Sequence, residues 1–316
     1  MTERANARER NVRWAGGAAH WIEKGTDNVR LFAWQKRAQE NIRFVGTVLF
    51  VHGSSMASQP TFDLHVEGRP WSSAMDWFAA RGFDTWCSDN EGYGRSSKQR
   101  NINFDIENGA EDLVAASRYI LQSSRSEKLL VYGISSGALK AGLFAQWHPE
   151  RVQRLALDAF VWTGKGSPTL EQRRRRLPEW KSTNRRPIDH AFVRSIFTRD
   201  HPGSADEATI EAFADAILTL DDSMPTGTYV DMCSRLPMVD PSRLAVPTLI
   251  MRGEYDGIAS FDDLMEFFRR LPNPDKQFTV MPGIAHASFQ QKNYLMVYQV
   301  LSAFFSRPSL AYAPEV

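Results

Sequence analysis

The stretch that decides the fold runs from residue 128 to residue 147 and reads KLLVYGISSGALKAGLFAQW. Residues 128–133 are mostly apolar and predict a strand, and residues 136–147 are small or apolar and predict a helix. Between them, residues 133–137 form a G-x-S-x-G sequence, whose glycines tolerate the crowding of a tight turn. The sequence therefore predicts a strand–turn–helix unit that holds the Ser135 side chain at its tip.

Strands and helices alternate on either side of this unit. The run VGTVLFV at residues 45–51 predicts a strand that is buried on both faces. Further strands are predicted at 20–23, 29–35, 83–88, 152–162, 246–251 and 277–281, and helices at 71–81, 106–122, 261–271 and 288–305. This order predicts the α/β class, with a mostly parallel central sheet that has helices on both faces.

The alternation breaks between residues 163 and 242, where we find no convincing strand and predict helices and turns. We therefore predict a core domain made of 17–162 and 243–306, with 163–242 as an inserted helical cap. The termini, 1–16 and 307–316, are predicted to be irregular. In open α/β sheets a ligand binds at the carboxyl ends of the strands, so we expect the site to lie beneath the insertion.

Composition excludes several classes of protein. The 316 residues are 42% hydrophobic and 24% charged, with a net charge of +1, which gives no reason to expect nucleic acid as a partner. The two cysteines, Cys87 and Cys233, are too few for a disulfide framework or a cysteine-rich zinc site. The chain has no run of 18 apolar residues and does not begin like a secretory signal. We expect a cytoplasmic protein without a membrane span, and a homo-oligomer remains possible.

A serine hydroxyl becomes a strong nucleophile only when a base removes its proton. His286, in the sequence MPGIAHA after the last predicted strand, is the predicted base for Ser135. The acid that orients this histidine is predicted to be Asp256, which follows the strand at 246–251. Asp158 and Glu254 remain as the second and third candidates.

The sequence HGSS at residues 52–55 follows the strand at 45–51 and supplies the predicted oxyanion hole. The backbone N–H groups of Ser54 and Ser136 are the expected donors. His52 is expected to make a structural hydrogen bond and not to act as a base. Gly53, Ser55 and Trp162 are predicted to contact the substrate, Gly53 because it lets the backbone approach closely.

Five segments in this order resemble an α/β-hydrolase-fold serine hydrolase: HGSS (52–55), DNEGYGRS (89–96), GISSG (133–137), RGEYDG (252–257) and PGIAHAS (282–288). The resemblance covers about residues 20–305, and it places a cap where the insertion lies. It implies a triad of Ser135, Asp256 and His286 that uses neither a metal nor an organic cofactor. Ser136 departs from the bulkier residue that many members carry after the nucleophile. A serine at 135 is also unlike the related dehalogenases and epoxide hydrolases, which use an aspartate there.

The first half of the insertion is basic. Residues 165–199 contain ten lysines and arginines and three acids, a net charge of +7. Residues 173–176 are four successive arginines, which cannot all point the same way on a helix. We expect most to be solvated, but one or two in the insertion facing the cleft would bind a substrate carboxylate.

The expected activity is therefore hydrolysis of a small-molecule carboxylic ester through an acyl-enzyme on Ser135, with a carboxylate-bearing monoester such as a monoalkyl phthalate as a specific candidate. One alternative is a carbon–carbon bond hydrolase that acts on a vinylogous diketo acid. Another is a non-catalytic ligand-binding or receptor module on the same fold.

Overall fold

The computed structural model describes residues 16–25 and 27–311. Its main sheet has eight strands in the order β1-β2-β4-β3-β5-β6-β9-β10. The strands are β1 (Ala18–Lys24), β2 (Val29–Lys36), β3 (Gly46–Val51), β4 (Phe83–Ser88), β5 (Leu129–Ile134), β6 (Val152–Asp158), β9 (Thr248–Gly253) and β10 (Lys276–Met281). β2 pairs antiparallel with β1 and β4, and the remaining neighbours are parallel. The predicted mostly parallel sheet is thus confirmed.

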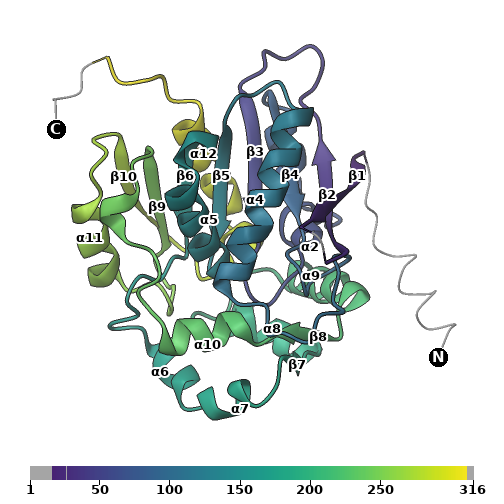
Figure 1. The fold of residues 1–316 in the computed structure, drawn as a ribbon, viewed down its shortest axis with the longest axis vertical. Helices are drawn as coiled ribbons and strands as arrows, with labels where there is room; N and C mark the ends of the chain where they lie inside the picture. The colour runs from purple at the N-terminus through teal and green to yellow at the C-terminus, as the bar shows by residue number, and fades with distance from the viewer. Residues whose placement is uncertain (1–15, 26, 312–316) are drawn as a thin grey trace, which may run out of the picture.

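Helices cover both faces of this sheet (Figure 1). Those of the core are α2 (Ser58–Phe62), α3 (Ala74–Ala79), α4 (Ile106–Ser123), α5 (Ser136–Trp147), α11 (Phe261–Arg270) and α12 (Tyr294–Phe305). Alternate residues of β5 point to opposite faces. Leu129 and Val131 join the core cluster with α4, α5 and α11, whereas Leu130 and Tyr132 join the cluster with α2, α3 and α12. All six residues of β5 are therefore buried.

The chain between β6 and β9 forms the insertion, drawn at the bottom of Figure 1. Its helices are α6 (Pro168–Arg174), α7 (Leu177–Lys181), α8 (His190–Thr198), α9 (Glu207–Leu220) and α10 (Gly227–Ser234). The expectation that 163–242 contains no strand was wrong, because β7 (Arg185–Pro187) and β8 (Ser223–Pro225) pair antiparallel. Each strand has only three residues, which is too short to show an alternating pattern. Each also ends in proline, a residue that disfavours strands.

Two predicted elements end elsewhere in the structure. The predicted strand at 152–162 stops at Asp158, because Ala159 adopts a positive φ of 49° and turns the chain off the sheet. The predicted helix at 288–305 is divided into a single 3-10 turn, Ser288–Gln290, and α12. Two further 3-10 turns lie at Pro149–Arg151 and Pro241–Arg243.

The predicted irregular termini fall mostly on residues 1–15 and 312–316, which lie outside the described residues. Within the part of the chain that the structure describes, none of the helices combines the length and the apolar character needed to cross a membrane.

Candidate active site

Ser135 lies at a tight turn between β5 and α5. Its backbone has φ of 59° and ψ of −125°, a conformation that is strained for a residue with a side chain. The turn is possible only because its neighbours are glycines. A Cβ atom on Gly133 would overlap the carbonyl oxygen of Gly137, and a Cβ atom on Gly137 would overlap that of Val51. The G-x-S-x-G pattern thus reflects packing of backbone against backbone.

Ser135, His286 and Asp256 form one chain of hydrogen bonds. Ser135 Oγ lies 2.9 Å from His286 Nε2, and His286 Nδ1 lies 3.0 Å and 3.1 Å from the two carboxylate oxygens of Asp256. All three side chains are buried. Asp256 Oδ1 also accepts hydrogen bonds from the backbone N–H groups of Ile258 and Ala259. With a proton on Nδ1, the imidazole presents a lone pair at Nε2 to the serine hydroxyl.

Burial raises the pKa of Asp256, but the neighbouring His286 and the backbone donors lower it by more, to about 2. The carboxylate is therefore ionised at any ordinary pH. Its charge faces Nδ1, where it stabilises the imidazolium that forms when the histidine takes a proton.

The other two candidate acids do not contact His286. Asp158 accepts a hydrogen bond from the Tyr132 hydroxyl at 2.6 Å, and its burial raises its pKa to about 7. Glu254 is exposed and accepts from the backbone N–H of Gly283 at 2.8 Å. Of the three acids predicted from sequence, only Asp256 has the geometry of a triad acid.

The predicted oxyanion donors lie on two loops that meet beside Ser135. Ser54 Oγ donates to Ser136 Oγ at 2.7 Å, which joins the loop after β3 to the start of α5. A Cβ atom on Gly53 would lie 3.3 Å from the Ser135 Cβ atom. Among the described residues, none accepts a hydrogen bond from the backbone N–H of Ser54 or Ser136. Both N–H groups are thus available to an incoming oxyanion, and that of Ser136 lies at a helix N-terminus.

His52 fixes the loop after β3 and does not contact Ser135. Its Nε2 accepts from the backbone N–H of Asn90 at 2.9 Å, and its Nδ1 donates to the Gly53 carbonyl at 2.8 Å. Burial strongly lowers the pKa of this imidazole, so it is neutral. The geometry agrees with the expected structural hydrogen bond.

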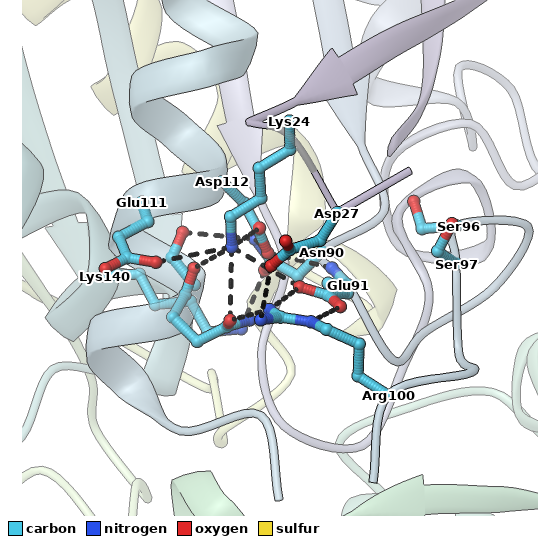
Figure 2. A network of polar contacts seen from close by, with 12 residues as sticks. Lys24, Asp27, Asn90, Glu91, Ser96, Ser97, Arg100, Glu111, Asp112 and Lys140 are labelled. Carbon is cyan, nitrogen blue, oxygen red and sulfur yellow. Dashed lines mark hydrogen bonds and ion pairs between the residues drawn. The ribbon is translucent and has the colours of Figure 1, made fainter. Parts of the chain in front are cut away.

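A buried polar network lies behind this loop (Figure 2). Lys140 donates to the Asn90 side chain at 2.8 Å, and Lys24 lies 2.7 Å from Asp112. The carboxylate of Asp112 also accepts from the Asn90 side chain and from the backbone N–H of Glu91. The network holds the segment after β4 against α4 and α5, and through Asn90 it holds His52.

A cavity of about 20 Å³, room for about one water molecule, lies between Ser135 and residues of the insertion. The cavity is lined by Ser54, Ser55, Met56, Ser135, Arg173, Ile196, Arg199, Tyr229 and His286. Two arginines of the basic insertion therefore face the predicted nucleophile.

Of the three predicted substrate contacts, Ser55 lines the cavity, whereas Gly53 and Trp162 do not. Trp162 does not line the cavity: it packs against Phe267 and its indole N–H donates to the Val239 carbonyl at 3.1 Å. Tyr229 does line it, with its hydroxyl 3.1 Å from Ser55 Oγ. No local pattern marks Tyr229, because the buried residues of α10 mix polar and apolar types: Gly227, Thr228, Tyr229, Asp231, Met232 and Cys233.

Among the residues that the structure describes, two groups of side chains have the composition of a metal site, and both are already engaged. Asp200, Asp256 and His286 lie together, but Asp200 binds Arg199 with both oxygens and Asp256 binds His286. The second group, Asp63, His65 and Asp76, lies beside a larger hollow of about 1000 Å³ that contains none of the predicted site residues. There the Lys36 ammonium lies 2.6 Å from both carboxylates and occupies the position of a cation.

Comparison with known proteins agrees with this geometry. Residues 45–293 match the family described as serine aminopeptidase, S33. No curated protein matches the chain.

Many solved structures share the fold, at low sequence identity. An E-2-(acetamidomethylene)succinate hydrolase is 18% identical, with a TM-score of 0.66 over 92% of this chain and 100% of its own. A thermophilic esterase from Thermogutta terrifontis, with malate bound, is 19% identical, with a TM-score of 0.63 over 91% and 97%. A monoglyceride lipase from Saccharomyces cerevisiae is 16% identical, with a TM-score of 0.70 over 93% and 96%. The matched residues and the shared fold show that this chain belongs to the serine aminopeptidase S33 family and is an α/β-hydrolase-fold serine hydrolase.

Proposed function

We propose that this protein hydrolyses a carboxylic ester through an acyl-enzyme on Ser135. The observation that carries the proposal is the continuous hydrogen-bonded chain from Ser135 through His286 to Asp256, beside two free backbone N–H groups. This arrangement has each part that acyl transfer needs: a nucleophile, a base, an acid that orients the base, and donors for the oxyanion.

In the first half of the reaction, Ser135 Oγ attacks the ester carbonyl carbon while His286 Nε2 takes the hydroxyl proton. The tetrahedral oxyanion accepts hydrogen bonds from the N–H groups of Ser54 and Ser136. The intermediate then collapses, the carbon–oxygen bond to the alcohol breaks, and His286 returns the proton to the leaving oxygen. In the second half, His286 Nε2 takes a proton from a water molecule that attacks the acyl carbon. The bond to Ser135 Oγ then breaks, His286 returns the proton to Oγ, and the acid leaves.

Residues 163–242 are proposed to act as the cap that covers this reaction. Excluding water strengthens the interactions between the donors and the developing oxyanion. Arg173 faces the cavity from this segment and has no acidic partner among the described residues, which favours an ester that keeps a free carboxylate, such as a monoalkyl phthalate. Two of the structural neighbours are in keeping with such a ligand, since one is named for a substituted succinate and the other has malate bound. The cytoplasmic location and a possible homo-oligomer stay predictions from sequence.

The test is product analysis by mass spectrometry with four substrates: p-nitrophenyl butyrate, a monoalkyl phthalate, a dialkyl phthalate and a vinylogous diketo acid. Each is incubated with wild type and with Ser135→Ala. We expect ester cleavage that Ser135→Ala abolishes. Cleavage of the diketo acid alone would replace the proposal by carbon–carbon hydrolysis, for which basic residues at the site are equally suitable. If Ser135→Ala matched wild type, or nothing turned over, the ester proposal would fail and a binding module would take its place.

A further inference from the structure

Two arginines beside the candidate active site have no acidic partner. Arg173, from α6, and Arg186, from β7, form no ion pair with any residue in the described parts of the chain. Other arginines of the insertion do: Arg199 binds Asp200, and Arg176 binds Glu179. Arg186 is 8% exposed, so little water can solvate its charge in place of an acidic partner. A buried charge without a counterion is costly, and such a pair of charges is suited to a ligand that brings a negative charge.

Both guanidinium groups converge on Tyr229. Each lies with its central carbon 4.3 Å from the centre of the tyrosine ring. Burial raises the pKa of the Tyr229 hydroxyl, but Arg173 and Arg186 lower it by more, to about 7. The positive charges that lower the pKa of this hydroxyl also favour an anion bound beside it.

The converging groups lie next to the predicted oxyanion hole. Arg186 Nη2 donates to Ser55 Oγ at 3.0 Å, and the Tyr229 hydroxyl lies 3.1 Å from the same atom. Ser55 directly follows Ser54, whose backbone N–H faces the developing oxyanion in the proposed mechanism. Arg173 and Tyr229 line the same small cavity as Ser135. An anion bound by these groups therefore lies only a few atoms from a carbonyl carbon positioned for attack.

We propose that Arg173, Arg186 and the Tyr229 hydroxyl form a carboxylate subsite, and that the substrates are half-esters of short dicarboxylic acids, in which few bonds separate the free carboxylate from the ester. This inference rests on the proposed ester hydrolysis for its substrate class. The two guanidinium groups bind the carboxylate by charge-assisted hydrogen bonds, and the tyrosine donates a third in its neutral form. Arg199 is not part of the subsite, because both of its contacts go to Asp200.

The kinetic test compares matched half-esters and diesters: monoethyl and diethyl phthalate, and monoethyl and diethyl succinate. Arg173→Gln and Arg186→Gln are measured beside Arg175→Gln, an exposed arginine of the same segment. For each arginine of the subsite, the ratio of kcat/KM for half-ester over diester is expected to fall about 10- to 100-fold, as expected for losing one charge-assisted contact. Arg175→Gln should leave the ratio at the wild-type value. An unchanged ratio in the subsite variants, or an equal fall in Arg175→Gln, would overturn the subsite.

The length of the substrate is tested with monoethyl sebacate, whose carboxylate lies much farther from its ester. Its kcat/KM with wild type is expected to be well below that of monoethyl succinate. Equal values would overturn the assignment to short dicarboxylic acids.

A binding measurement separates the subsite from the ester proposal. Phthalate dianion is titrated calorimetrically into wild type, Ser135→Ala and Arg186→Gln. Binding to the first two and at least tenfold weaker binding to Arg186→Gln would support the subsite, even if no ester were hydrolysed and the proposed function failed. Equal binding to all three, or binding to none, would overturn the subsite while leaving cleavage of neutral esters untouched.

Discussion

Replacing Asp256 by asparagine removes the charge that faces His286 and keeps the size of the side chain. In the structure the carboxylate contacts Nδ1 and two backbone N–H groups, and the net effect of its surroundings lowers its pKa from 3.8 to about 2. That difference corresponds to about 2 kcal/mol in favour of the ionised form, or a factor of between 10 and 100.

The amide adds a second effect. If its NH₂ group donates to Nδ1, the imidazole proton moves to Nε2, where the serine hydroxyl needs a lone pair. In a Ser-His-Asp triad, replacing the acid by an amide in this way lowers kcat by about 10⁴. We therefore expect kcat of Asp256→Asn to fall by about 10³ to 10⁴, with a much smaller change in KM.

The assay is steady-state hydrolysis of p-nitrophenyl butyrate, with circular dichroism to show that each variant is folded. Asp158→Asn is the matched control: it makes the same change in a buried aspartate that has no contact with His286. Its kcat should stay within about threefold of wild type, since its carboxyl group bonds to Tyr132 and the substitution keeps the backbone hydrogen bond from the Ser135 N–H to the Asp158 carbonyl. A kcat for Asp256→Asn within tenfold of wild type, or an equal loss in Asp158→Asn, would refute the assignment of Asp256.

Three further predictions concern stability and ionisation. The pKa of Asp158 is about 7 in the folded state and 3.8 when unfolded, so the free energy of unfolding should decrease by about 4 kcal/mol as the pH rises between these values. Chemical denaturation should show this loss in wild type and not in Asp158→Asn. Tyr229 should give a phenolate absorbance that titrates near pH 7 and is absent in Tyr229→Phe. Because the phenolate competes with the substrate for the arginines, KM for a half-ester should rise above that pH. Ionisation of Tyr229 only in the ordinary range of tyrosine would contradict this prediction. Gly137→Ala should unfold at a much lower temperature than wild type, because its Cβ atom would overlap the Val51 carbonyl; an unchanged melting temperature would show that the turn is less crowded than described.

The sheet and the catalytic turn were accessible from sequence because their signals are local. The apolar run that forms β5 and the glycines around Ser135 each express a constraint within a few residues. The placement of His286 and Asp256 depended on a topological rule, that loops after parallel strands meet at one edge of the sheet. Asp158 also follows a parallel strand, so that rule could not choose between the acids. The choice is made by side-chain direction, since Asp158 turns to Tyr132.

The lining of the cavity was not accessible, because it depends on how the insertion folds back. Arg173 faces Tyr229, whereas Arg174 to Arg176 are exposed. Which arginine faces the cavity depends on the rotational position of the residues about the axis of a helix that ends at Arg174. Arg186 reaches the site from a strand too short to predict. Trp162 was predicted to supply an apolar wall of the site; after the turn at Ala159 it packs into the core against Phe267 instead.

The role of Ser135 as nucleophile is tested by the site at which a covalent inhibitor attaches. Wild type, Ser135→Ala and His286→Gln are treated with a p-nitrophenyl alkylphosphonate, digested, and analysed by tandem mass spectrometry while p-nitrophenol release is followed. We predict one adduct, on Ser135, that forms at the same rate as activity is lost. It should be absent in Ser135→Ala and form about 10³-fold more slowly in His286→Gln. An adduct on another side chain, or labelling of Ser135 that leaves activity intact, would contradict the central claim that Ser135 is the nucleophile of this hydrolase.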